Sequence, residues 1–134
     1  MKQYRPRIAD GMLRRRLMGV GAVLIQGPKW CGKTTTAEQQ AKSVVYMDDP
    51  EYMEQNVELA SLSPNKLLAG ATPRLIDEWQ LAPQLWDAAR FEVDHRDEVL
   101  SSPYPRSNYI LCHTCRERQY YHCSLLRPIC HFFL

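Results

Sequence analysis

The chain has 134 residues, enough for one small domain, and its 45% apolar and 24% charged residues are an ordinary balance for a globular protein. The formal net charge of +2 gives no nucleic-acid signal, and we interpret the basic run at residues 14–16 as the solvated side of a helix. A secretory signal and an apolar stretch long enough to span a bilayer are not recognisable, so we expect a cytoplasmic protein with no membrane partner.

The first predicted elements are a helix and a buried strand. Asp10 is expected to cap a helix over residues 10–17, and Gly19 to close it. The apolar run at residues 20–25 predicts a short strand, and residues 34–42 have strong helix character. Between the strand and this second helix, the segment from Gly27 to Thr34 matches the phosphate-binding pattern G-x-x-x-x-G-K-T.

The chemistry of this loop follows from its residue types. Gly27 and Gly32 let the backbone curl so that successive N–H groups point at phosphate oxygens, and the following helix adds partial positive charge. The Lys33 ammonium can reach the terminal phosphates, and the Thr34 hydroxyl can ligate magnesium. The alternative is a chance glycine turn before a helix. Trp30 either contacts a nucleotide base or faces solvent.

Further elements alternate along the chain. Strands are expected at residues 44–47 and 75–77, and helices at residues 51–60, 64–70 and 83–93. This alternation predicts an α/β fold with a parallel sheet covered by helices on both faces. Trp79 and Trp86 are interpreted as packing residues.

The strand at residues 75–77 ends in Asp77, and Glu78 follows directly. A carboxylate at the end of such a strand, beside a phosphate-binding loop, is suited to hold magnesium. The adjacent glutamate can orient or deprotonate the attacking water. Asp77 is therefore the candidate metal residue and Glu78 the candidate base. The alternative is that both cap the helix expected to begin near Pro83.

Composition changes after residue 98. Residues 99–134 hold four of the five cysteines and three of the four histidines, contain no glycine, and offer one strand-like run at residues 108–111. One interpretation is a zinc site, and a disulfide framework is another. Residues 112–115 supply a C-x-x-C pattern, and the residues that could complete four ligands are His122, Cys123, Cys130 and His131.

Residues 4–98 resemble the N-terminal part of the prokaryotic AAA-type ATPases that carry a C-terminal domain of unknown role. The segments that carry the resemblance are residues 4–8, 21–34, 36–39 and 73–80. It implies a P-loop core of the additional-strand, catalytic-glutamate type that binds Mg-ATP. Thr34 and Asp77 are the implied magnesium residues, and Lys33 and Glu78 the implied catalytic residues. The implied phosphate-binding residues are Gly27, Pro28, Lys29, Trp30, Cys31, Gly32, Lys33, Thr34 and Thr35.

The resemblance also bears on the tail. The related ATPases continue with a strand close to Phe-Ile-Leu-Thr-Gly-Ser, whose polar end faces the γ-phosphate. Codons for residues 99–103 can be chosen that read Phe-Ile-Leu-Thr when shifted by one base. We therefore interpret residues 1–98 as the ATP-binding domain and residues 99–134 as a frameshifted or prematurely ended continuation. The sheet is then expected to lack the strand between those at residues 20–25 and 75–77.

Three functional hypotheses follow. The leading one is an ATP-binding domain whose parent protein hydrolyses ATP to drive a conformational change in a partner, with this short form a weak or inactive enzyme. A small P-loop kinase is the second, and an inactive fragment with a zinc- or partner-binding tail is the third. ATP is favoured over GTP because no N-K-x-D guanine signature is present. The sequence does not identify a protein partner or an oligomeric state. Three arginines are interpreted either as contacts to a neighbouring subunit or as surface charges: Arg74, Arg90 and Arg96.

Overall fold

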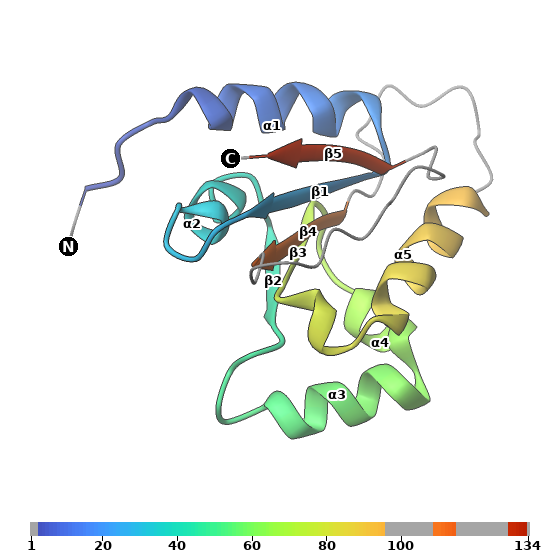
Figure 1. Ribbon diagram of the computed structural model, residues 1–134. Coiled ribbons are helices and arrows are strands. Elements are labelled where there is room, and N and C mark those ends of the chain that lie inside the picture. The colour runs from blue at the N-terminus through green and yellow to red at the C-terminus, as the bar shows by residue number, and fades with distance from the viewer. Residues whose placement is uncertain (1–2, 96–108, 115–128, 134) are drawn as a thin grey trace.

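The computed structural model describes residues 3–95, 109–114 and 129–133. In this part of the chain, helices and strands alternate through most of the sequence, and the chain ends in two strands (Figure 1). The helices are α1 (Ile8–Gly19), α2 (Lys33–Glu38), α3 (Met53–Leu62), α4 (Pro64–Leu68) and α5 (Gln84–Asp94), with a 3-10 turn, η1 (Trp79–Leu81). The strands are β1 (Ala22–Gly27), β2 (Ser43–Tyr46), β3 (Arg74–Asp77), β4 (Tyr109–Thr114) and β5 (Ile129–Phe133).

These strands form one five-stranded sheet in the order β2-β3-β4-β1-β5, and every pairing is parallel. The predicted α/β class with a parallel sheet is confirmed. The expectation of an incomplete sheet is wrong, because β4 pairs with β1 along its whole length and with β3 along its first half. The backbone groups of β1 and β3 therefore find a common neighbour, and the strand that provides it comes from residues 99–134.

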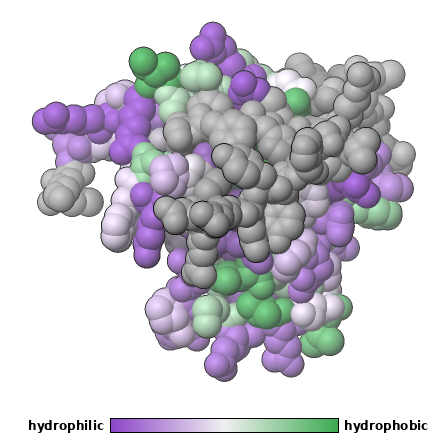
Figure 2. Space-filling view, viewed as in Figure 1, coloured by the Kyte–Doolittle hydropathy of each residue, from purple (hydrophilic) through white to green (hydrophobic). Residues whose placement is uncertain are grey.

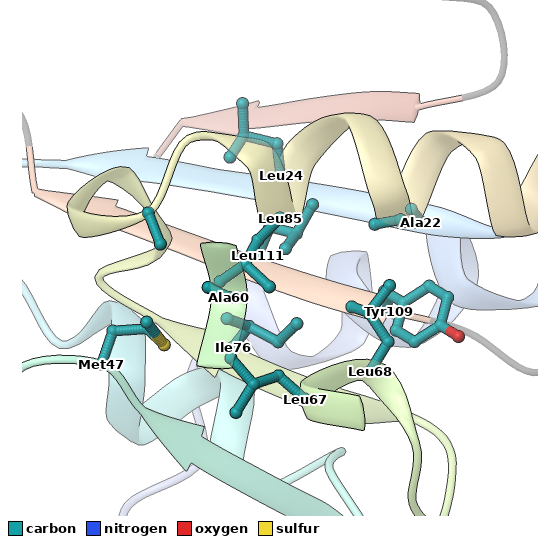
Figure 3. Packing of buried hydrophobic residues seen from close by; sticks show 12 residues of the cluster. Ala22, Leu24, Met47, Ala60, Leu67, Leu68, Ile76, Leu85, Tyr109 and Leu111 are labelled. Atoms are coloured by element: carbon teal, nitrogen blue, oxygen red, sulfur yellow. The ribbon is translucent and has the colours of Figure 1, made fainter. Parts of the chain in front are cut away.

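Helices cover both faces of the sheet, and each face has its own core. On one face, α1 and α2 pack their apolar side chains on β1, β3 and β4; the buried residues include Leu13, Val23, Ala37, Leu75 and Ile110. On the other face, α3, α4 and α5 pack on the same three strands. Figure 3 shows Leu24, Ile76, Leu85 and Leu111 of this second cluster facing a common interior. Since side chains alternate along a strand, Ile110 and Leu111 enter different cores.

Local sequence explains how two helices are placed. Asp10 lies at the third position of α1 and not at its cap, because Arg7 precedes the helix and donates its backbone N–H to the Asp10 carboxylate at 2.8 Å. Gly21 allows α5 to approach the start of β1, since a Cβ at Gly21 would lie 2.5 Å from a methyl carbon of Val93. The predicted packing role of the two tryptophans is confirmed, with the rings of Trp79 and Trp86 5.1 Å apart and both in contact with the second core.

The surface carries both polar and apolar side chains. Among the residues that Figure 2 colours, hydrophilic ones lie along the left and lower margins, and apolar ones are visible below the centre and at the upper left. None of the helices in the described ranges combines the length and the apolar character needed to cross a membrane.

Candidate functional site

The carboxyl ends of parallel strands meet at one edge of a sheet, and the predicted site residues lie at this edge. Gly27 at the end of β1 stands opposite Thr114 at the end of β4. Asp77 ends the next strand, β3, and Glu78 follows it. The loop between β1 and α2 lies at the same edge, so residues from three strands and one loop come together there.

The loop turns back on itself through two left-handed residues. Trp30 has φ 64° and Gly32 has φ 91°, and Gly32 directly precedes α2. Glycine takes such a φ without steric cost, whereas most residues avoid it. The Gly32 carbonyl accepts the backbone N–H of Thr36 at 2.9 Å and so begins the helical hydrogen bonds of α2. The predicted strand, loop and helix are therefore all present.

Lys33 lies across the inside of this loop. Its side chain is 5% exposed, and its ammonium donates a hydrogen bond to the Pro28 carbonyl at 2.9 Å. Lys29 and Trp30 lie on the outside, with the Lys29 ammonium 5.1 Å from the centre of the Trp30 ring and Trp30 91% exposed. The loop thus contains one buried lysine, Lys33, and one exposed lysine, Lys29, so that the effect of replacing one can be compared with the effect of replacing the other.

Thr34 and Asp77 connect the loop to β3. The Thr34 hydroxyl donates to Asp77 Oδ2 at 2.9 Å, although the two residues are 43 positions apart. Asp77 is 5% exposed, and its Oδ1 is buried with no hydrogen-bond partner among the described residues. Burial raises the pKa of Asp77, the hydrogen bond from Thr34 lowers it, and the nearby charges of Glu78 and Asp48 raise it further.

This pair fits a magnesium ion. Mg²⁺ prefers oxygen ligands, and its sites in proteins use one or two carboxylates together with hydroxyls, waters and substrate phosphates. A buried carboxylate oxygen without a partner is costly, and a bound cation would offset that cost. The Thr34 hydroxyl and the Asp77 carboxylate are therefore oxygen ligands of the kind that Mg²⁺ takes, and a bound ion would give the buried Asp77 Oδ1 a partner.

Glu78 is held by two neighbours. Its backbone is left-handed, with φ 52°. One carboxylate oxygen accepts a hydrogen bond from the Gln80 side-chain amide, and the other accepts one from the Thr114 hydroxyl. Neither η1 nor α5 has a side-chain cap. The alternative in which Asp77 and Glu78 serve as helix caps is therefore wrong, because both carboxylates are used elsewhere.

Thr114 is a site residue that sequence reasoning missed. It lies inside the C-x-x-C pattern, which drew attention to the cysteines. The signal was nevertheless present, since an apolar stretch followed by a polar end occurs both at residues 109–114 and at residues 75–77. His113 also lies near Glu78, with its ring 5.9 Å from that of Trp79. Burial lowers the pKa of His113, while the Glu78 charge acts to raise it.

The zinc interpretation receives no support from the described residues. Cys112 is fully buried in the core beneath α1 and α2, and burial raises the pKa of its thiol. His113 points to the opposite face, as the alternation of β4 requires. Within the described ranges no three metal-ligating side chains come together. The side chains of Cys115, His122, Cys123, Cys130 and His131 lie outside the described part.

The three arginines considered as contacts to a neighbouring subunit lie in different environments. Arg74 is half-buried and donates to the Leu67 carbonyl at 2.6 Å and to the Ser43 hydroxyl at 2.8 Å. Arg74 therefore joins α4 to the start of β2. From the sequence, only a contact to a neighbour or a surface charge was expected for this residue. Arg90 is exposed on α5, and Arg96 lies outside the described residues.

Of the predicted site residues, Lys33, Thr34, Asp77 and Glu78 come together, whereas Lys29, Trp30 and Thr35 are exposed. Neither a protein-family profile nor a curated protein matches this chain. The function is therefore inferred from the chemistry and geometry of the site.

Proposed function

We propose that this chain is a Mg-ATP-binding domain of AAA type, from a protein that hydrolyses ATP. The observation that carries the proposal is the contact of Thr34 with Asp77, which leaves one buried carboxylate oxygen without a partner next to a phosphate-binding loop. A chance glycine turn has no reason to join its threonine to a buried acidic residue on another strand.

The sheet order adds support. β4 lies between the strand that precedes the loop and the strand that ends in Asp77. This separation by one strand is what the resemblance to additional-strand ATPases implies. The polar end of the intervening strand is Thr114, which contacts Glu78. The resemblance likewise implies a strand with a polar end, close to Phe-Ile-Leu-Thr-Gly-Ser, that faces the γ-phosphate.

Each residue has a distinct role in the proposed reaction. The loop N–H groups and the Lys33 ammonium bind the phosphate oxygens. Thr34 and Asp77 would hold magnesium, which supplies positive charge to the β- and γ-phosphate oxygens when bound. Glu78 accepts a proton from the water that attacks the γ-phosphorus, and the bond to the ADP oxygen breaks. Gln80 and Thr114 hold the Glu78 carboxylate in place.

The first experiment measures nucleotide binding by calorimetry in the parental protein, Lys33→Ala and Lys29→Ala. Lys33→Ala should weaken Mg-ATP binding by about tenfold or more, because a charge-assisted contact to phosphate is lost. Lys29→Ala removes an exposed lysine of the same loop and should leave the affinity within about threefold. An unchanged affinity in folded Lys33→Ala would overturn the assignment of the loop.

The second experiment identifies the product. Release of free phosphate from Mg-ATP indicates hydrolysis, whereas a phosphorylated acceptor indicates a kinase. The position of Glu78 favours hydrolysis, because a carboxylate beside the γ-phosphate activates water. Formation of a phosphorylated acceptor without free phosphate would overturn the hydrolase part of the proposal.

A further inference from the structure

Arg7 contacts the phosphate-binding loop from outside. It lies just before α1, and its Nη1 is 3.3 Å from the Cys31 carbonyl oxygen and 3.3 Å from the Gly32 carbonyl oxygen. A Cβ at Gly32 would lie 1.7 Å from this same nitrogen. The guanidinium group therefore occupies the space that glycine leaves open. The positive φ is what favours glycine at position 32, and a Cβ there would have to displace the Arg7 side chain.

The two carbonyls contacted by Arg7 belong to peptide units that the proposed function uses. A peptide bond is planar and trans, so its C=O and N–H point in opposite directions. The Cys31 carbonyl shares a peptide unit with the Gly32 N–H, and the Gly32 carbonyl shares one with the Lys33 N–H. A cation beside these carbonyls favours the orientation in which the two N–H groups point away from it. The Gly32 carbonyl also accepts the Thr36 N–H at 2.9 Å, so α2 and Arg7 act together on the Lys33 N–H, whereas Arg7 acts on the Gly32 N–H through the Cys31 carbonyl.

The segment that carries Arg7 is itself anchored. Asp10 is buried, and it accepts hydrogen bonds from the Tyr4 hydroxyl at 2.5 Å and from the Arg7 backbone N–H at 2.8 Å. Burial acts to raise the pKa of Asp10, but these two hydrogen bonds hold it below its usual range. The Asp10 carboxylate is thus ionised at neutral pH and connects residues 4–7 to α1.

We propose that Arg7 is a positioning residue of the phosphate-binding loop, which orients the Gly32 and Lys33 N–H groups for the phosphates of a nucleotide. This inference rests on the proposed function. It adds that the segment before α1 contributes to nucleotide affinity, although that segment lies outside the loop motif.

The test compares Arg7→Ala, Arg7→Lys and Arg5→Ala with the parental chain, by calorimetry with Mg-ATP and Mg-ADP. Arg7→Ala should weaken both nucleotides by about tenfold, because both place a β-phosphate on the loop. Arg7→Lys keeps the charge on a shorter side chain whose ammonium is less well placed to reach both carbonyls, so it should recover part of that loss. Arg5→Ala removes an exposed arginine of the same segment and should bind like the parent. Without nucleotide, all four proteins should melt at the same temperature, since the backbone bond from residue 7 to Asp10 is kept.

The outcomes separate the inference from the proposed function. If the parental chain binds neither nucleotide, the proposed function fails, and the inference fails with it. If the parent binds and Arg7→Ala binds equally well, only the inference is overturned. A melting temperature of nucleotide-free Arg7→Ala well below that of Arg5→Ala would assign Arg7 to folding and would also overturn the inference.

Discussion

At the scale of single residues, burial disfavours the charged form of the Asp77 carboxyl group. Its carboxylate is buried with one oxygen unpaired, and burial raises its pKa above the ordinary value of 3.8. The folded state therefore holds a proton to higher pH than the unfolded state does. Stability is lost as the pH rises from that ordinary value through the raised pKa, and at neutral pH the charged carboxylate opposes folding.

Asp77→Asn should consequently stabilise the nucleotide-free protein at neutral pH while weakening its function. We expect the free energy of unfolding to rise by roughly 1 kcal/mol, because a buried charge is replaced by a neutral amide. Nucleotide affinity should lose its dependence on magnesium. Urea unfolding and calorimetry with and without Mg²⁺ check the two effects. Asp87→Asn, at an exposed position of α5, is the control and should change neither by a comparable amount. A less stable Asp77→Asn protein would contradict the prediction.

Glu78 should differ from Asp77 in its kinetic signature. Glu78→Gln keeps the shape of the side chain and can still accept the Thr114 hydrogen bond, but it cannot take a proton from water. Mg-ATP affinity should stay within about threefold, while phosphate release slows by about 10²–10⁴-fold. Steady-state phosphate assays on the purified variant measure this. Hydrolysis at the parental rate would show that Glu78 is not the base.

At the scale of elements, β4 lies at the centre of the sheet and joins its two halves. It separates β1 from β3, and it contributes Ile110 to one core and Leu111 to the other. Sequence composition marked residues 99–134 as foreign to the domain, yet this strand completes the middle of the sheet. A frameshift origin of this segment concerns the gene, and sequencing its reading frames would test that proposal.

The role of β4 predicts the cost of truncating its side chains. Ile110 is fully buried, so Ile110→Ala should lower the free energy of unfolding by about 2–5 kcal/mol. Leu62→Ala on α3, where the side chain is 77% exposed, should cost less than about 0.5 kcal/mol. Chemical denaturation of both variants gives the comparison. Equal stabilities would mean that residues 109–114 do not fold into the sheet.

The end of helix α2 cannot be predicted from the local sequence. Residues 34–42 were predicted as one helix, but α2 ends at Glu38. Ala41 still donates its N–H to the Ala37 carbonyl at 3.0 Å, whereas the Lys42 N–H donates to the Pro73 carbonyl at 2.8 Å, at the start of the ladder between β2 and β3. A pairing partner about thirty residues away in the sequence therefore ends the helix, and helix propensity carries no information about it.

At the scale of the whole molecule, the single chain should hydrolyse ATP slowly. The site supplies Lys33, two carboxylates and Thr114, whereas the resembled ATPases add an arginine from a neighbouring subunit. Such an arginine contributes about 10³–10⁵ in rate where it has been measured in nucleotide hydrolases. Phosphate release by monodisperse protein should therefore stay well below roughly 1 s⁻¹. A faster turnover that Glu78→Gln abolishes would show that this chain needs no such help.

The sequence alone determined the loop, the acidic pair and the alternation of helices and strands. These features depend on contacts between residues close in the chain, so residue type and spacing are enough to predict them. The contact of Thr34 with Asp77 is also within reach of sequence reasoning, because Thr34 begins the helix expected after one strand and Asp77 ends another.

Only the tertiary structure decided which strand separates β1 from β3, and hence that Thr114 contacts Glu78. It also decided that Arg7 lies against the loop and that Cys112 belongs to a core. Every residue type except proline can both donate and accept backbone hydrogen bonds between strands, so these bonds leave little trace in the sequence. Contacts across 24 or 36 positions, as at Arg7 and Thr114, depend on how the elements pack and not on any local pattern.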